Sequence, residues 1–136
     1  MADLAAPDFE HGPEFLHASG FRVTEMSPTR VTGWIDLGSG HHTPWGIVHG
    51  GVYAAAVETA ASLGASAAAA AHDQIAVGVT NTTHFLRPLT TGRVVVVATP
   101  IQQGRTQQLW NVDITDESDR LIATGQVRLQ NVAPPP

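Results

Sequence analysis

The sequence predicts an α+β domain in which one long helix lies inside a curved antiparallel sheet. The run from residue 50 to about residue 71 contains no proline and is mostly alanine, the best helix former, and it is longer than an ordinary strand. Segments rich in valine, isoleucine, threonine and aromatic residues lie on both sides of this run. Their short connections indicate antiparallel pairing, so the expected order of elements is β-β-α-β-β-β-β.

The elements before the long helix form a hairpin and a loop. Residues 14–18 predict a short helix. Residues 21–25 and 30–37 alternate polar and apolar side chains around a Ser-Pro turn signal, which predicts a first antiparallel hairpin. Residues 38–46 are predicted to be a loop.

The long helix and the four segments after it complete the sheet. Apolar residues go nearly all the way round the helix, so we expect it to be buried on most sides, and their small size would let a sheet approach closely. Glycine, proline and aspartate turn signals separate the later strand segments. Four consecutive strands with short connections predict an antiparallel meander over residues 75–85, 93–102, 106–115 and 120–130.

Composition indicates one domain over residues 1–136, with residues 1–18 and 133–136 peripheral. Only 14% of the residues are charged whereas 43% are hydrophobic, so we expect partner chains to cover part of the surface and the protein to self-associate. The net charge of −5 argues against a nucleic-acid binder, which would need a basic surface.

The sequence lacks cysteine, which excludes disulfides and thiolate chemistry. The first residues are acidic and rich in proline, so no secretory signal is visible. Glu58, Thr59 and Ser62 interrupt the best apolar run before it reaches the ~18 residues of a membrane span. We therefore expect a cytoplasmic protein that does not cross a membrane.

The start of the long helix carries the clearest functional signal. His49, Gly50 and Gly51 lead into the helix, where bare backbone N–H groups can bind a negative or polarised atom. Glu58 follows inside the alanine run. Oriented N–H donors and an isolated carboxylate are the minimal equipment for attack on a carbonyl, which predicts an enzyme. A tight turn and a helix cap are the alternative interpretation of the histidine and the glycine pair.

Glu58 is the strongest single candidate, because a carboxylate in a buried helix face is costly unless it is paired or used. The alternative is that it reaches solvent or pairs with an arginine such as Arg87. Ser62 lies one turn further along the same face, where its hydroxyl could hold the carboxylate or a water. A helical serine among alanines is otherwise a packing residue.

His49 and Glu58 are nine residues apart, so they project from opposite sides of one helix and lie ~13 Å apart along its axis. They cannot meet within one chain. If the two residues cooperate, they do so across an isologous dimer in which a second helix lies antiparallel to the first.

Other kinds of site find less support. Seven histidines invite a metal hypothesis, but no HxH, HExxH or paired histidine and carboxylate spacing supplies a ligand set, so we expect no metal. No Gly-x-Ser-x-Gly elbow supports a serine hydrolase. Arginine-containing turns could bind phosphates or could be solvated hairpin tips. The candidate phosphate-binding residues are Arg87, Gly104, Arg105 and Thr106.

Two stretches of the sequence resemble one family. GIVHGGVYAAAVETAASLGA and THFLRPLTTGRVVVVATPIQQGRTQQLWNVDITDE are similar to the hotdog-fold acyl-CoA thioesterases. The resemblance favours the branch of phenylacetic-acid-degradation-type, 4-hydroxybenzoyl-CoA and 1,4-dihydroxy-2-naphthoyl-CoA thioesterases, which uses a glutamate, and it covers roughly residues 20–130. It implies a hotdog fold, dimers that commonly pair into tetramers, and hydrolysis of an acyl-CoA with no cofactor besides the CoA of the substrate.

The resemblance also implies roles for individual residues. The backbone N–H that polarises the carbonyl falls on Gly50, with His49 in support and Gly51 at the substrate. The nucleophile or general base falls on Glu58 of the other subunit, and the hydroxyl that orients the carboxylate or binds water falls on Ser62. The CoA phosphates would lie near the arginine-containing turns.

One position departs from the family. Many members place a glutamine six residues before the histidine to touch the thioester oxygen, whereas this chain has the shorter Thr43. A non-catalytic acyl-CoA sensor and a hotdog hydratase or dehydratase are the alternatives to a thioesterase. The acyl group is expected to be aromatic or of medium length, and Trp45, Tyr53 and Phe85 could line its pocket or belong to the core.

Overall fold

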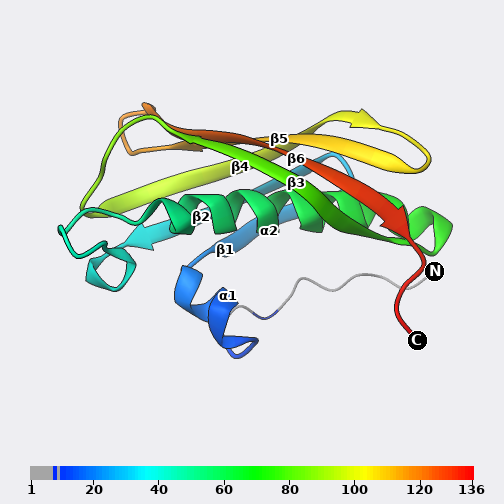
Figure 1. Cartoon of the computed structure of the whole chain (residues 1–136), viewed down its shortest axis with the longest axis horizontal. Helices are drawn as coiled ribbons and strands as arrows, with labels where there is room; N and C mark the ends of the chain where they lie inside the picture. Colours follow the sequence, from blue (N-terminus) through cyan, green and yellow to red (C-terminus); the bar gives the residue numbers. More distant parts are fainter. Residues whose placement is uncertain (1–7, 9) are drawn as a thin grey trace.

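The computed structural model, which describes residue 8 and residues 10–136, is built from six antiparallel strands that curve around one long helix (Figure 1). Single 3₁₀ turns at Ser39–His41 and Ala70–His72 lie on either side of the long helix. The predicted α+β architecture is confirmed, and the sheet stays open. The elements are α1 (Glu14–Ser19), β1 (Arg22–Ser27), β2 (Arg30–Leu37), α2 (Gly50–Ala69), β3 (Ile75–Phe85), β4 (Gly92–Gln103), β5 (Gln107–Thr115) and β6 (Leu121–Val132).

The order of strands across the sheet is β1-β2-β4-β5-β6-β3, which corrects the predicted four-stranded meander. Strands β4, β5 and β6 do form a meander, but β3 pairs with β6 at the far edge, and β4 pairs with β2. Residues 86–91 return the chain from β3 past the loop before α2, where the Val48 N–H donates to the Leu89 carbonyl. The short connection therefore passes the start of the helix and joins two strands that are not neighbours in the sheet.

Helix α2 packs one face against the concave side of the sheet. Its buried residues recur at the three- and four-residue spacing of a helix, and most are alanine. Gly64 lies directly under the Trp110 ring, so even a methyl group there would collide with the indole. The other sides of α2 are half-buried in the single chain, which corrects the expectation of burial on most sides. The buried residues are Tyr53, Ala56, Val57, Ala60, Ala61, Gly64, Ala65 and Ala69.

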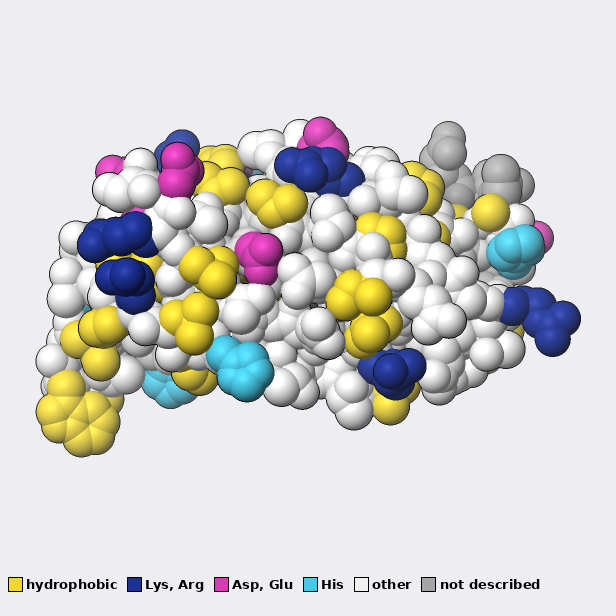
Figure 2. All heavy atoms as spheres, turned by 90° about the horizontal axis from the view of Figure 1, so that it is seen from above, with side chains coloured by type: hydrophobic (Ala, Val, Ile, Leu, Met, Phe, Trp, Pro, Cys, Tyr) yellow, Lys and Arg dark blue, Asp and Glu magenta, His cyan; other side chains and the backbone are white. Residues whose placement is uncertain are grey.

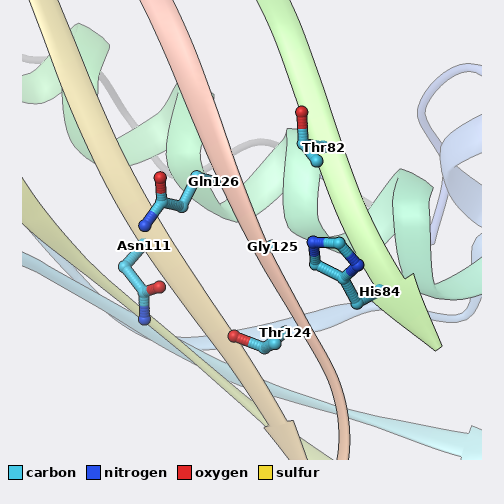
Figure 3. A pocket seen from close by; sticks show the side chains of 6 residues that line it. All are labelled: Thr82, His84, Asn111, Thr124, Gly125 and Gln126. Carbon is cyan, nitrogen blue, oxygen red and sulfur yellow. The ribbon is translucent and has the colours of Figure 1, made fainter. Parts of the chain in front are cut away.

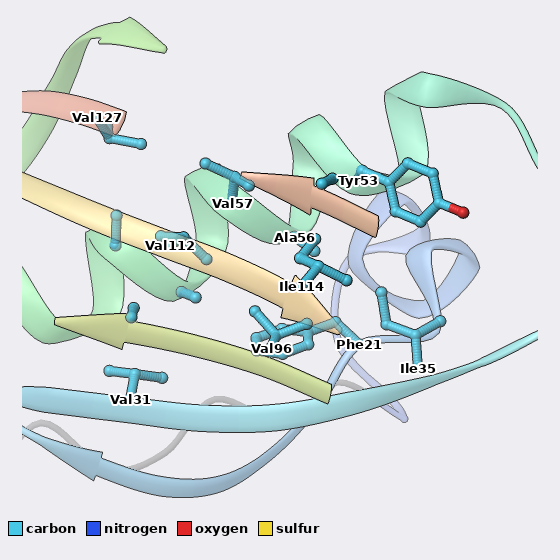
Figure 4. Packing of buried hydrophobic residues seen from close by; sticks show 14 of the residues in the cluster. Phe21, Val31, Ile35, Tyr53, Ala56, Val57, Val96, Val112, Ile114 and Val127 are labelled. Atoms are coloured by element: carbon cyan, nitrogen blue, oxygen red, sulfur yellow. The ribbon is translucent and has the colours of Figure 1, made fainter. Parts of the chain in front are cut away.

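The core lies between this face of α2 and the inward side chains of the strands (Figure 4). Strand β5 shows the alternation clearly, because every second residue from Gln108 to Ile114 is buried. Gln108 is the polar member of this row. It donates to the Ala65 carbonyl and accepts a hydrogen bond from the Trp110 ring nitrogen, both at 2.9 Å, so its burial is compensated.

On the outer face of the sheet, hydrophobic side chains and a few charged ones are scattered among uncharged polar side chains and backbone (Figure 2). Helix α1 lies at the other side, against α2, with Leu16 packed on the core. Of the segments predicted to be peripheral, residues 1–7 and 9 lie outside the described part of the chain.

By length and composition the helical stretch 50–72 could cross a membrane, since it is 23 residues long and contains an 18-residue window with a mean hydropathy of 1.2. From the sequence we expected no membrane span here, because polar residues interrupt the apolar run. Strands cover the inner face of this helix, so its apolar character is that of a core helix.

Candidate functional site

The first turn of α2 presents an unpaired backbone donor. His49 caps the helix by accepting the Gly51 N–H at its Nδ1 atom, at 2.8 Å, and the His49 N–H donates to the His41 carbonyl, also at 2.8 Å. Within the described residues, the Gly50 N–H has no acceptor. It lies at the positive end of a 20-residue helix, which favours a negative or polarised atom.

Gly50 and Gly51 are required by close contacts. A Cβ on Gly50 would come within 2.6 Å of the Phe85 ring, and a Cβ on Gly51 would come within 2.8 Å of the His49 ring. A larger residue at position 50 would displace the end of β3, and a larger residue at position 51 would displace the capping histidine. The glycine pair therefore belongs to a packed helix start.

Two of the three candidate aromatic residues meet beside this helix start. The rings of Tyr53 and Phe85 lie 6.2 Å apart at an interplanar angle of 42°. Tyr53 is buried, its hydroxyl has no hydrogen-bond partner among the described residues, and burial raises its pKa. Figure 4 shows this hydroxyl directed away from the neighbouring core side chains. Trp45 is 85% exposed and stands apart from them.

Glu58 faces β3 from a half-buried side of α2, which corrects the expectation that it lies in the buried face. Its Oε2 atom accepts a hydrogen bond from Asn81 Nδ2 at 3.1 Å, and its Oε1 atom lies over Gly78. No arginine pairs with it in the described part of the chain, Arg87 included. Glu58 is thus a carboxylate held by a neutral amide.

Ser62 and Thr43 are differently placed. Ser62 is half-buried one turn beyond Glu58, and its hydroxyl makes no hydrogen bond within the described residues. Thr43 belongs to the tight loop before α2, where its Oγ1 atom accepts the Trp45 N–H at 3.2 Å. Its N–H also donates to the Ile47 carbonyl at 2.7 Å. The Thr43 side chain therefore stabilises the loop.

His49 and Glu58 lie on different sides of α2. His49 and Val52 line a groove of about 460 Å³ against α1, with Phe15 on its far wall, whereas Glu58 faces β3. One chain does not bring the two side chains together, as the helical spacing predicted. Gly50, by contrast, faces β3 through Phe85 on the same side as Glu58, ~12 Å away along the axis.

The candidate phosphate-binding residues lie at opposite ends of the molecule. Arg87 is in the connection that passes the start of α2, whereas Gly104 and Arg105 line a groove of about 470 Å³ with Ala69 and His72 at the end of α2. Thr106 continues the β4–β5 turn and accepts the Asn131 N–H. Within one chain these residues do not form a single anion site.

A separate small hollow of about 240 Å³ opens on the outer face of the sheet, lined by β3, β5 and β6 (Figure 3). Its side chains are polar, with His84 as the titratable member. Beside it, the Thr124 hydroxyl donates to Asp113 at 2.7 Å. This hollow lies on the opposite face of β3 from Glu58. No group of three histidine or carboxylate side chains in the described ranges could hold a metal ion.

Sequence reasoning missed Gly78 and Asn81 of β3, which contact Glu58, and Thr83, which contacts Asn81. The available signal was the polar run at residues 80–84 within a strand whose first residues are mostly apolar, since asparagine is unfavourable in strands. The pattern could not reveal which of these side chains face the helix.

Comparison with known proteins places the chain among enzymes. Residues 46–123 match the family model described as the thioesterase superfamily. A Mycobacterium tuberculosis protein, named provisionally as an esterase, is 44% identical over 83% of this chain and 82% of its own length. Its solved structure covers 90% of this chain and 98% of its own, with a TM-score of 0.86 at 42% identity.

Two further relatives have more specific names. The 1,4-dihydroxy-2-naphthoyl-CoA thioesterase 2 of Arabidopsis thaliana is 33% identical over 86% of this chain and 82% of the plant protein. The solved structure of a Haemophilus influenzae thioesterase is 28% identical, covers 88% of this chain and 82% of that chain, and has a TM-score of 0.81.

Proposed function

This chain belongs to the thioesterase superfamily and is a thioester hydrolase with a hotdog fold, and from that premise we propose that it cleaves an aromatic or medium-chain acyl-CoA to the free acid and CoA. One observation carries the proposal. The unpaired Gly50 N–H and the Glu58 carboxylate, which no arginine neutralises, lie on the same side of one helix. The name of the plant relative supports an aromatic acyl-CoA.

In the proposed mechanism the thioester carbonyl docks on the start of α2. The Gly50 N–H and the helix dipole stabilise the negative charge that develops on the carbonyl oxygen. Glu58 then attacks the carbonyl carbon or takes a proton from an attacking water, the carbon–sulfur bond breaks, and CoA leaves as the thiolate. Water supplies the second oxygen of the acid in either case. The CoA of the substrate is the only coenzyme that this route uses.

We place the reacting Glu58 on the partner subunit of a dimer. Within one chain, Glu58 is two helical turns from Gly50, which is too far for both to touch one carbonyl. Glu58 contacts Gly78 on β3, which is a free edge of the sheet, so a second copy beside β3 would meet this carboxylate. Pairing of two such dimers, and a place in the cytoplasm, belong to the same proposal.

The partner subunit also gives the remaining candidates a role. An antiparallel second α2 would bring the end of one chain that carries Arg105 toward the end of the other that carries Arg87, where both could meet the CoA phosphates. His49 would support the helix start, Gly51 would line the substrate site, and Ser62 would orient Glu58 or a water. Thr43 would act only through the loop.

The test is release of free thiol from a panel of aromatic and aliphatic acyl-CoAs. We expect cleavage of some member by the wild type, and a loss of at least ~100-fold in kcat for Glu58→Gln and Glu58→Ala, which signifies a direct chemical role. Glu25→Gln, a matched change in the exposed β1–β2 hairpin, should leave the rate unchanged. Binding of CoA esters without cleavage would instead favour the acyl-CoA sensor.

A further inference from the structure

A bulge in β3 turns two of its residues toward the same carboxylate. Gly78 and Thr80 pair with adjacent residues of β6, so Val79 is an extra residue in the strand. In a regular strand, positions 78 and 81 would point to opposite faces. The bulge reverses the alternation, so both positions face α2. Bulges are common beside active sites because they re-aim side chains in this way.

The two re-aimed positions contact Glu58 differently. Gly78 supplies space, since a Cβ there would collide with Oε1 of Glu58. Asn81 supplies a donor, since its Nδ2 atom lies 3.1 Å from Oε2 of Glu58 and 3.1 Å from the Ala54 carbonyl oxygen. The Asn81 amide therefore ties the carboxylate to the backbone one helical turn before it.

Thr83 supports the orientation of this amide. Its hydroxyl donates to Asn81 Oδ1 at 2.7 Å, so it satisfies the amide oxygen while the amide nitrogen faces α2. The reversed amide would set its oxygen against two other acceptors, the Glu58 carboxylate and the Ala54 carbonyl. Asn81 consequently has one favourable orientation, that of a donor to Glu58.

The hydrogen bond from Asn81 to Glu58 is better explained by a role in catalysis than by a contribution to folding stability. Asn81 is exposed in the single chain, where a hydrogen bond between side chains adds little to folding. A neutral donor also leaves the charge of Glu58 intact, whereas an arginine would neutralise it. In the described part of the chain, Oε1 of Glu58 has no hydrogen bond.

From these contacts we propose that Asn81 is a positioning residue that holds Oε2 of Glu58, so that Oε1 is presented to the thioester or to its attacking water. The inference rests on the proposed function. Asn81 touches neither the substrate nor the reacting atoms, and Thr83 acts one step further away, through Asn81.

The test compares neutral variants that lack the donor. Asn81→Leu keeps a similar volume, removes the amide donor and adds no charge beside Glu58, and we expect kcat to fall about 10- to 100-fold, the size of a lost hydrogen bond to a charged group, while KM changes by less than about twofold. Thr83→Val should lower kcat by about threefold, and Thr83→Ser, which keeps the hydroxyl, should restore it. The double-mutant cycle below uses Asn81→Ala, and its control is Asn111→Ala on the outer face of the sheet. The kcat of Asn111→Ala should match that of the wild type.

A double-mutant cycle separates positioning from a structural effect. If Asn81 acts only through Glu58, then Asn81→Ala added to Glu58→Gln should cause no further loss of kcat. A wild type that cleaves no thioester would overturn the proposed function together with this inference. Three outcomes with an active wild type would overturn the role of Asn81 and leave the proposed function in place. They are full kcat in Asn81→Leu, a change in the KM of that variant alone, and a further loss of kcat in the double variant.

Discussion

At the scale of single residues, the role of the Gly50 N–H can be tested by removing that one hydrogen. Gly50 is the first helical position, where proline is tolerated, and His49 has φ −67° and ψ 131°, a conformation that suits a residue before proline. Gly50→Pro therefore deletes the donor and preserves the helix. We expect kcat to fall at least ~100-fold relative to Gly50→Ala, as when an oxyanion donor is removed.

Gly50→Ala is the matched control, because both substitutions place a Cβ against Phe85 and only proline lacks the N–H. Adding Phe85→Ala to each variant relieves that shared contact and should leave the difference between them unchanged. Equal kcat values for the two variants would mean that the N–H does not stabilise the oxyanion.

Residues next to one another in the sequence were easier to predict than residues that meet through the sheet. The arrangement of His49, Gly50 and Glu58 on the helix could be predicted from one continuous segment, because the helical period fixes it. Asn81 could not, since the bulge at Val79 decides which face it occupies and nothing in a run of polar strand residues marks a bulge. The separation of Arg87 from Arg105 likewise depended on the path of the chain.

At the scale of elements, the pairing of β2 with β4 makes the stability depend on pH in the acid range. Asp36 lies opposite Arg93, whose guanidinium donates to both carboxylate oxygens, at 2.7 and 2.9 Å, and packs over the Trp34 ring at 3.9 Å. These hydrogen bonds hold the pKa of Asp36 below its usual value. The folded state thus binds the Asp36 proton less readily than the unfolded state does.

Because the folded pKa of Asp36 is the lower one, the Asp36–Arg93 pair stabilises the folded state most at neutral pH. This contribution to the free energy of unfolding is fully present above the unfolded pKa of Asp36 and is lost as pH falls through the lower folded pKa. We expect urea midpoints of the wild type and Asp36→Asn to differ at about pH 7 and to converge toward about pH 3. Arg93→Gln should remove the same acid-range dependence. Parallel curves for the wild type and Asp36→Asn would show that this pair does not contribute.

The bounds of the helix and strands were predicted well, whereas the pairing of the strands was predicted less well. Helix α2 and all six strands begin and end close to the predicted positions, because propensity and turn residues act locally. The position of β3 at the far edge was predicted wrongly, since a curled sheet lets a short connection run between strands that are not adjacent. Burial of α2 was overestimated, because composition cannot show which sides of a helix the sheet leaves uncovered.

At the scale of the whole molecule, β3 is an open edge with exposed apolar side chains. Val77 is 47% exposed and Val79 is 57% exposed, although both lie in a strand. An edge of this kind is a template for pairing with another strand. A second copy paired through β3 would cover these valines and would set two α2 helices side by side and antiparallel, the arrangement that the proposed composite site needs.

Mixing two inactive variants tests whether the site is shared between subunits. Gly50→Pro and Glu58→Ala chains, refolded together in equal amounts, should form heterodimers in which one of the two sites combines an intact Gly50 from one chain with an intact Glu58 from the other. Because about half of the dimers are mixed, we expect about a quarter of the wild-type rate. If each chain supplied its own complete site, the mixture would keep only the residual activities of its components.

The reciprocal mixture provides the control. Wild-type chains refolded with the double variant Gly50→Pro/Glu58→Ala give heterodimers in which a shared site is always missing one residue. Only the wild-type homodimers are then active, and the rate should be about a quarter of that of the same total amount of wild type. Sites contained within one chain would give about half, because every wild-type chain would stay active whatever its partner. The two mixtures therefore decide between a shared and a private site without a structure of the complex.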